Sequence, residues 1–545
     1  MDWRAVTFRR RTTLLAIFAG MVFCLCAQGQ ERYPLEVQAK EFQASKFQER
    51  LPPPALGENV ERLPAATPAM PLADDCTPQY EPAMGCGAYR SDYFRDDFGA
   101  DPINYQLPFD SCLEREPYET KTPLRTQRPW IEWGRPFYDY GPYPPSSTIL
   151  GRTNLVAPQF LVYGDFRSAL ASRNSGGVAN NQIASRLNLE GDLKLTSTER
   201  FHASLQPLNR NGNFTRVEFN SQDAQFTQAF NANLVTGYLE ADLGALWGGL
   251  TGKVLPFELP IAIGAMPLLF QNGIWLDDNV IGAAVSLPAK NSRVFDIPNF
   301  DITFFYLFDN INSPAFQGDN SAAKTYGVAS FFDVAEGYIE LDCAFLEDRT
   351  NLNRSYHNLG LSYTRRYGGV LSNSVRLISN LGQEANGIAN TADGLLLLME
   401  NSLITADPYL FVPYFNLFAG FRRPQSVARN GAAGGILRNT GILFESDNLT
   451  GYPTLDATGN EAYGGALGVN MIPAAINQQL VLEYAFVNVM DDIAFRKAQG
   501  NQQGLAMRYQ RNLSNSWLMR ADAMYGFLDN AKDISGIRLE ARHKF

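Results

Sequence analysis

Polar and apolar residues alternate along most of the chain beyond about residue 155. In the stretch RLNLEGDLKLT (186–196), leucines occupy every odd position except Gly191, and polar residues occupy the even positions. Successive side chains of a β-strand point to opposite faces, so this pattern gives one apolar and one polar face. GYIELDCAFLED (337–348) and SWLMRADAMYGFLD (516–529) repeat it, with turn residues between such segments. The pattern predicts an all-β protein and is typical of a transmembrane barrel with lipid outside and water inside.

The alternating segments give eighteen candidate strands between residues 158 and 545, including two at 233–247 and 249–257. Single-chain bacterial barrels have an even number of strands, and strand boundaries inferred from a sequence shift by a few residues. We therefore expect a closed antiparallel transmembrane β-barrel of 16–18 strands.

The chain ends on the alternating stretch SGIRLEARHKF (535–545). In a closed barrel the last strand pairs with the first, because unpaired backbone groups in lipid cost several kcal/mol each. We therefore expect Phe545 to be structural. An aromatic last residue after alternating apolar ones also resembles the assembly signal of bacterial outer-membrane barrels, from which only His543 departs. This resemblance implies recognition by the barrel-assembly machinery.

The N-terminal region differs from the rest of the chain. A basic start, an apolar stretch from Leu14 to Ala27 and small residues near Gly29 predict a secretory signal peptide over 1–29. Residues 30–150 hold 18 of the 31 prolines and show no sustained period, which predicts a mostly irregular periplasmic arm. The aromatic cluster around Trp130 and Trp133 is too apolar for a linker, so we expect that part to be packed. Residues 151–545 are then the barrel.

Composition excludes several classes of protein. With 46 basic and 56 acidic residues the net charge is −10, which argues against a nucleic-acid partner. After Ala27 no uninterrupted apolar stretch reaches the roughly 20 residues that a spanning helix needs.

Cys76, Cys86 and Cys112 allow one disulfide after export, and the sequence does not choose the pair. Cys343 stands alone at a strand position predicted to face lipid.

The sequence shows no sign of catalytic chemistry. The three histidines, His202, His357 and His543, have strand-like surroundings. No nucleophile elbow, zinc-protease motif, P-loop, dinucleotide fingerprint or paired Cys-x-x-Cys occurs. We expect neither an enzyme, nor a cofactor, nor a metal site.

Function is expected in the lumen, where the polar faces of the strands meet water. The candidate pore-lining residues carry both signs of charge: Arg366, Arg376, Arg508, Arg520, Arg538, Arg542, Glu340, Asp342, Glu483 and Asp522. Because a ring of one sign selects ions, the mixed lining favours a passive or weakly selective channel for small hydrophilic solutes. An anion preference follows if the arginines form one wall. The alternative is a plugged structural barrel that anchors the arm in the cell envelope.

Three stretches look familiar: YPPSSTILGRTNLVAPQFLVYGDFR (143–167), NSLITADPYLFVPYFNLFAGFRRPQSVAR (401–429) and GYPTLDATGNEAYGGALGVN (451–470). They resemble an uncharacterised family of exported, porin-like outer-membrane barrel proteins from planctomycete-type bacteria. The resemblance spans most of residues 130–545. It implies contact with outer-membrane lipid and a porin-like architecture.

Two stretches depart from the alternation. DITFFYLF (301–308) is apolar on both faces, and the proline-interrupted 255–275 is apolar almost throughout. An apolar row inside a water-filled barrel needs a partner. Either 255–275 folds inward against this row as a constriction, or both stretches are outer walls at a subunit interface, as in a homotrimer.

Overall fold

The computed structural model describes residues 129–134 and 146–545, apart from 211, 221–222, 254, 296, 407–409, 431–434, 446–448, 473–477 and 492–497. The predicted signal peptide and most of the predicted arm, with Cys76, Cys86 and Cys112, lie outside the described residues.

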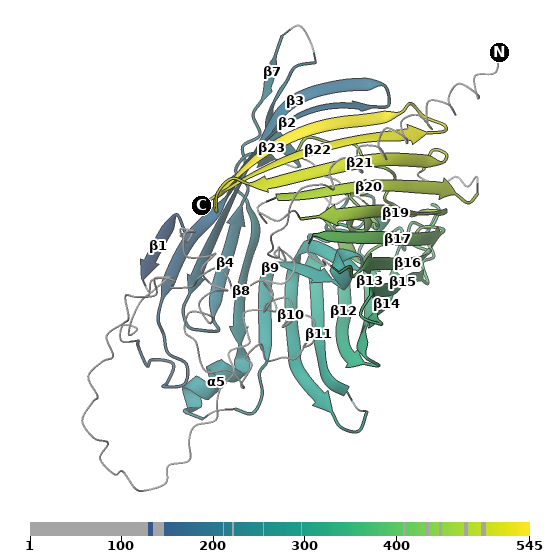
Figure 1. Ribbon diagram of the computed structural model, residues 1–545. Helices are drawn as coiled ribbons and strands as arrows, with labels where there is room; N and C mark the ends of the chain where they lie inside the picture. The colour runs from purple at the N-terminus through teal and green to yellow at the C-terminus, as the bar shows by residue number, and fades with distance from the viewer. Residues whose placement is uncertain are drawn as a thin grey trace, which may run out of the picture. The chain divides into compact units, whose positions relative to one another are not determined.

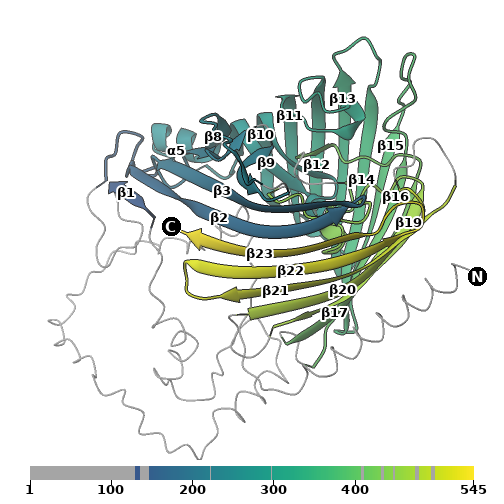
Figure 2. The same ribbon diagram turned by 90° about the horizontal axis from the view of Figure 1, so that it is seen from above.

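Eighteen strands form one closed antiparallel β-barrel (Figures 1 and 2). Each wall strand pairs with the next one, and β23 pairs with β2 to close the ring. The expected closed barrel of 16–18 strands is thus confirmed, with eighteen strands. In order around the wall, the strands are β2 (Gln159–Ser175), β3 (Val178–Lys194), β4 (Arg200–Leu205), β8 (Leu234–Asp242), β9 (Pro260–Phe270), β10 (Leu276–Ser292), β11 (Ile297–Asp309), β12 (Ala323–Val334), β13 (Gly337–Asp348), β14 (Tyr356–Tyr367), β15 (Leu371–Leu381), β16 (Leu395–Leu403), β17 (Phe411–Phe421), β19 (Ala462–Met471), β20 (Gln478–Val489), β21 (Gln502–Asn512), β22 (Trp517–Leu528) and β23 (Ile534–Lys544).

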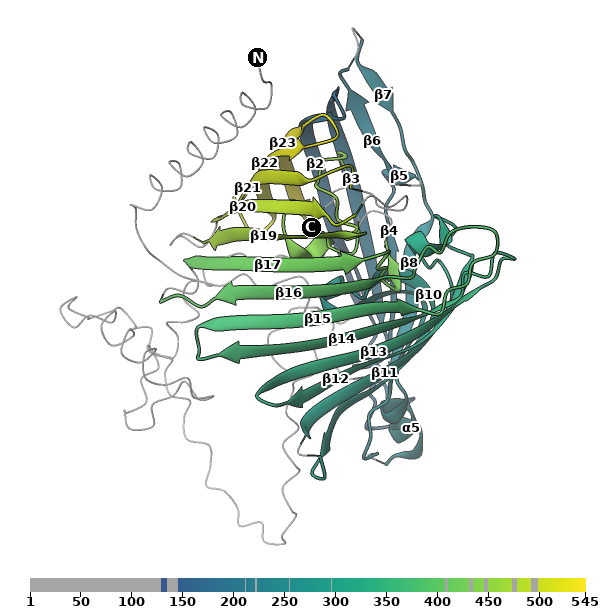
Figure 3. The same ribbon diagram turned by 90° about the vertical axis from the view of Figure 1, so that its right-hand side faces the viewer.

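Smaller elements are attached to this wall. Strand β6 pairs with β3 and with β7, and Figure 3 shows β6 and β7 extending beyond the neighbouring wall strands. Among the residues that the structure describes, no helix is long and apolar enough to cross a membrane. The smaller elements are β1 (Ile131–Gly134), β5 (Asn209–Arg210), β6 (Asn213–Glu218), β7 (Gln225–Thr227), β18 (Ala428–Arg429), the helix α5 (Leu243–Thr251) and the 3-10 turns η1 (Gln271–Gly273), η2 (Pro314–Phe316) and η4 (Arg438–Thr440).

The two ends of the barrel differ in the length of their connections. The start of β2 and the end of β23 lie at one end, here called the terminal end. Short connections such as 335–336 and 368–370 join strands there. The opposite end, here called the loop end, carries longer connections, including 310–322 and 422–461.

The alternation in sequence separates two faces of the wall. On β13, Leu341 and Cys343 are exposed on the outward face, as predicted. Asp342, between them in sequence, is buried on the inward face and accepts a hydrogen bond from Nε2 of Gln271 at 2.8 Å. The polar face of the strand therefore meets other protein groups inside the barrel.

One predicted strand is wrong. The described residues of 249–257, which exclude 254, form no strand: α5 ends in this stretch, and the wall continues with β9. The helix begins because the Asp242 side chain caps it, accepting from the backbone N–H of Ala245 at 2.8 Å. It ends at Gly252, whose φ of 67° suits glycine. The stretch 255–275 is thus mainly a wall strand, which corrects the idea that all of it folds inward.

Phe545 closes the ring at the terminal end. Its backbone N–H donates to the carbonyl of Gly164 at 3.0 Å, and its carbonyl accepts from the N–H of Gly164 at 2.8 Å. Its ring meets that of Trp130, with centroids 5.4 Å apart, and Trp133 packs on Phe160 at 5.5 Å. The structural role of Phe545 is therefore as predicted. Trp130 and Trp133 make these ring contacts but stay 68% and 65% exposed, so the expected packing of this part is only partial.

An apolar cluster fills part of the barrel interior. Phe305, from the stretch that is apolar on both faces, points inward against Trp275 and Phe270, with ring centroids 6.1 and 5.9 Å apart. Trp275 is fully buried and donates through Nε1 to Oδ1 of Asn358 at 3.0 Å. The inward apolar row thus has a partner, formed by the end of β9 and the turn that follows it (270–275).

The connection 422–461 is here called the crossing loop, and its described residues 435–445 run across the lumen. At one side Nη1 of Arg438 lies 3.5 Å from Oδ2 of Asp277 on β10. At the other side the backbone N–H of Leu443 donates to Glu483 on β20 at 2.8 Å. Strands β10 and β20 lie half-way around the ring from each other. The crossing loop therefore spans the barrel.

Candidate channel lining

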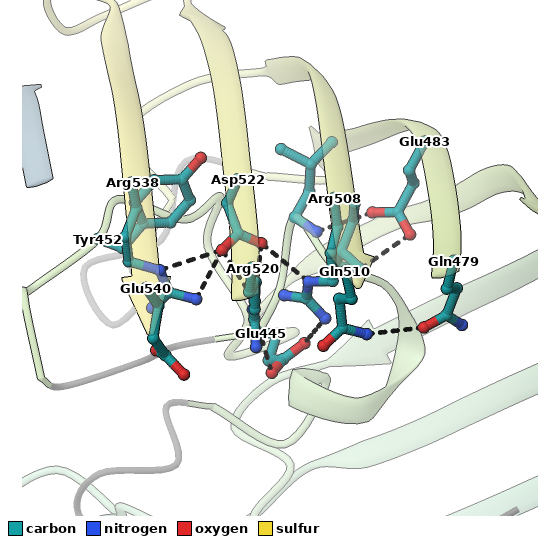
Figure 4. Close-up of polar contacts among 12 residues, drawn as sticks. Glu445, Tyr452, Gln479, Glu483, Arg508, Gln510, Arg520, Asp522, Arg538 and Glu540 are labelled. Carbon is teal, nitrogen blue, oxygen red and sulfur yellow. Dashed lines mark hydrogen bonds and ion pairs between the residues drawn. The ribbon is translucent and has the colours of Figure 1, made fainter. Parts of the chain in front are cut away.

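Three arginines on the last three strands share one carboxylate (Figure 4). The sheet register places Asp522 of β22 between Arg508 of β21 and Arg538 of β23. Asp522 accepts from Nε of Arg508 at 2.9 Å, from Nε of Arg520 at 2.8 Å and from Nη2 of Arg538 at 2.8 Å. Opposite charges thus face each other across the ladder, which is the favourable arrangement for cross-strand pairs.

The same alternation continues toward the terminal end. The register aligns Arg520 with Glu540. Glu540 in turn accepts two parallel hydrogen bonds from Arg167 of β2, at 3.0 and 2.8 Å. Nε of Arg542 lies 3.0 Å from Oδ2 of Asp165. Arginine–carboxylate pairs of this kind fix the geometry of both partners.

The crossing loop adds residues to this surface. Oε2 of Glu445 accepts from Nη1 of Arg508 at 2.6 Å. Burial disfavours the charged form of Glu445, but Arg508 and Arg520 outweigh it and hold its pKa below the usual value. The guanidinium carbon of Arg538 lies over the ring of Tyr452, 5.3 Å from the ring centroid. The loop is therefore bound to the arginines by charge.

Glu483 holds the loop to β20. It accepts from the backbone N–H groups of Ile442 and Leu443, both at 2.8 Å, and from the hydroxyl of Tyr414 at 2.6 Å. Gly441 allows this approach, since a Cβ there would lie 2.7 Å from Oε2 of Glu483. Glu483 was predicted to line the pore. It does lie on the inward face, but it is buried there against the crossing loop.

The other predicted lining residues lie elsewhere on the inward face. Glu340 accepts from the hydroxyl of Ser362 at 2.6 Å, and Nη2 of Arg376 lies 4.0 Å away from it. Arg376 is buried and pairs with Glu400. Arg366 is exposed near the end of β14 and is remote in the register from the cluster around Asp522. The predicted residues thus form two groups, of which the one on β20–β23 is the denser.

The geometry bears on the conditional expectation of one arginine wall. Arg508, Arg520, Arg538 and Arg542 do lie on one wall, but carboxylates alternate with them. With Arg167 included, the arginines of the wall outnumber Asp165, Glu445, Asp522 and Glu540 by one. The alternation gives this surface many polar contacts and little net charge.

Sequence reasoning missed several members of the site. Glu445 and Tyr452 lie in the crossing loop, which has no strand period to place their side chains. Asp165 and Arg167 lie on β2, the first wall strand, and meet Arg542 and Glu540 only because the ring closes. The alternation along β2 puts Asp165 and Arg167 on the same face. Since a closed barrel pairs the first strand with the last, these two residues could have been predicted to lie beside the inward residues of β23.

The three histidines have distinct surroundings. His202 lies between two carboxylates, with Nδ1 3.0 Å from Asp192 and Nε2 3.1 Å from Glu190. The ring of His357 stacks near Phe345, at 4.9 Å, and that of His543 near Trp517, at 4.5 Å. Within the part of the chain that the structure describes, no group of three or more His, Cys, Asp or Glu residues is arranged to hold a metal ion.

Comparison with known proteins gives matches among solved structures alone. No protein-family model and no curated protein matches the chain. The chain is similar to OccK5 (OpdH) of Pseudomonas aeruginosa, at 10% identity over 71% of this chain and 98% of that one, with a TM-score of 0.45. It is also similar to OccK11 (OpdR) of the same organism, at 9% identity over 71% and 96%, with a TM-score of 0.46. The outer membrane protein OpdK of that organism matches at 11% identity over 70% and 98%, with a TM-score of 0.45. The strand pairing described above, rather than this likeness, defines the fold.

Proposed function

We propose that the protein is a porin-like channel of the bacterial outer membrane, through which small hydrophilic solutes diffuse past the crossing loop. The observation that carries the proposal is the charged inward surface of β2 and β21–β23. Arg167, Arg520 and Arg542 keep 17%, 12% and 22% of their side chains exposed. Charged groups that retain water inside a closed barrel offer a polar path to solutes.

The orientation follows from the connections. In bacterial barrels short turns face the periplasm and longer loops face the exterior. The terminal end would then lie in the periplasm, together with the N-terminal arm, and the exposed apolar wall would contact outer-membrane lipid. Recognition by the barrel-assembly machinery and assembly into a homotrimer stay predictions from the sequence.

A second candidate is a structural barrel that anchors the arm. The observation in its favour is the apolar cluster inside the barrel, where Trp275, Phe316 and Phe444 are fully buried. If this cluster and the crossing loop close the lumen, the barrel carries no solute.

Conductance separates the two candidates. Folded protein in a planar lipid bilayer should give steady conductance in potassium chloride if it is a channel, and none if it is a plugged anchor.

Changing Arg508, Arg520 and Arg538 together to Gln should shift the reversal potential toward cations, because Asp522 would keep its charge without its partners. The shift should fade above about 0.1 M salt, where charges are screened over about 10 Å. Arg365→Gln, which removes an arginine paired with Glu336 at an exposed turn, is the control. An unchanged reversal potential in a conducting triple variant would remove these arginines from the path.

A further inference from the structure

Arg429 is a buried cation whose hydrogen bonds are incomplete. Strand β18 holds its backbone parallel to β10, with Arg429 opposite Asp277. Only 4% of the residue is exposed. Nη1 donates to the carbonyl of Ile436 at 3.1 Å, whereas Nε and Nη2 are buried and have no hydrogen-bond partner among the described residues. A buried charged donor without a partner carries the full cost of its desolvation.

The two free donors of Arg429 lie on one edge of the guanidinium. N–H groups on Nε and Nη2 point the same way, and their spacing matches two oxygens of one carboxylate or phosphate. The free edge is therefore the one that recognises an oxyanion with two parallel hydrogen bonds.

A second arginine brings additional positive charge to the same place. Nη1 of Arg438, a residue of η4, lies 3.5 Å from Oδ2 of Asp277. Nε of Arg438 is buried and has no hydrogen-bond partner among the described residues. Burial lowers the pKa of Arg429 to about 10; Asp277 opposes the shift and Arg438 adds to it. Arg429 therefore stays charged at neutral pH, and two arginines face the single carboxylate of Asp277.

The cluster is reachable from water. The side chains of Arg438 and Asp277 are 29% and 28% exposed. Arg438 and Asp277 are thus the water-exposed members of the cluster, and the free edge of Arg429, opposite Asp277 in the register, is its buried member.

We propose that Arg429 and Arg438, where the crossing loop meets β10, form a binding site for a small oxyanion, either a carboxylate or a phosphate. The site would add an oxyanion ligand to the proposed channel function. It rests on that function in one respect only, namely that the site lies along the path of the solute. A bound oxyanion would satisfy the free donors of Arg429 and balance the second arginine.

Calorimetric titration of the folded, full-length protein in detergent tests the site, with inorganic phosphate and acetate as separate probes. Wild-type protein should bind at least one of them, and the probe that binds identifies the oxyanion. Arg429→Gln and Arg438→Gln should each weaken binding at least tenfold. Arg422→Gln is the control, because Arg422 lies on the same loop with 64% of its side chain exposed and pairs with Asp393. Its affinity should equal that of wild type.

Two results would overturn the site: no binding of either probe by folded wild-type protein, or wild-type affinity in Arg438→Gln. Arg438 is partly exposed, so this variant remains informative if Arg429→Gln fails to fold. Conductance in potassium chloride is measured on the same preparation. Binding without conductance would refute the channel and leave the site, whereas conductance without binding would refute the site alone.

Discussion

At the scale of single residues, Asp522 determines whether the arginine wall is stable. Three guanidinium groups surround this buried carboxylate, and removing its charge would leave Arg508, Arg520 and Arg538 facing one another. Breaking a buried ion pair by removing one partner costs about 3–5 kcal/mol. The local effect should therefore be large even though the whole wall carries little net charge.

We predict that Asp522→Asn lowers the free energy of unfolding by about 3–5 kcal/mol and moves the reversal potential of the channel toward anions. Unfolding of the purified barrel, followed by heat modifiability on gels, measures the first effect. Glu336→Gln is the matched control, since this carboxylate is exposed and its pair with Arg365 contributes about 0–1 kcal/mol. Equal stability of the Asp522 variant and wild type would contradict the shared-carboxylate arrangement.

The sequence predicts which face these residues occupy but not their neighbours. The period of two places Arg508, Arg520 and Arg538 inward, and they do point inward. Whether Asp522 lies opposite Arg508 or two residues away depends on strand register, which the turns set. For this reason the sequence predicts a lining of mixed charge but leaves open whether the arginines form a basic wall or alternate with carboxylates, as they do here.

At the scale of elements, the crossing loop is held inside the barrel by contacts with the wall. Its attachment to β20 depends on Glu483, whose carboxylate accepts two backbone N–H groups of the loop. An amide at that position would present an N–H group where an acceptor is needed, leaving a buried donor unpaired at a cost of about 1–3 kcal/mol.

We expect Glu483→Gln to loosen the crossing loop and make it cleavable by trypsin at Arg438, while the barrel wall stays intact. Tyr414→Phe is the control, because it removes only the wall hydroxyl that donates to Glu483 and leaves both bonds to the loop. Digestion followed by mass spectrometry locates the cut. Equal protection of Arg438 in the Glu483 variant and wild type would mean that Glu483 does not hold the loop.

The element that sequence reasoning misplaced has a physical explanation. Prolines disfavour a central strand, so the sequence predicts no strand between 257 and 279. In the structure Pro267 pairs with Asn279 of β10, whereas the pairing of β9 with β8 ends at Ala265. Pro267 thus lies where β9 has one neighbour and a missing N–H costs no hydrogen bond of the sheet. The crossing loop has no period at all, so its path across the lumen was invisible in the sequence.

At the scale of the whole molecule, ring closure depends on the contact between the two ends of the wall. Phe545 and Gly164 exchange two backbone hydrogen bonds, and a Cβ at Gly164 would lie 2.1 Å from the carbonyl oxygen of Asn188 and 3.2 Å from the ring of Phe545. Closure therefore requires both the last residue and a glycine opposite it. The sequence predicts the role of Phe545, because a closed barrel must pair its last strand with its first. It does not predict the need for glycine at 164, which depends on how closely β2, β3 and the chain end approach one another.

This contact separates two roles of the chain end. Deleting Phe545 removes both the closing hydrogen bonds and the residue that would be recognised during assembly. Gly164→Ala disturbs closure while leaving the last residue unchanged. We predict that both variants lower the fraction of heat-modifiable, membrane-inserted barrel while export continues. Gly191→Ala on β3 is the control, because the nearest atom to a Cβ there is 3.8 Å away. If the deletion lowers insertion and Gly164→Ala matches the control, the chain end acts through recognition alone and the closure argument fails.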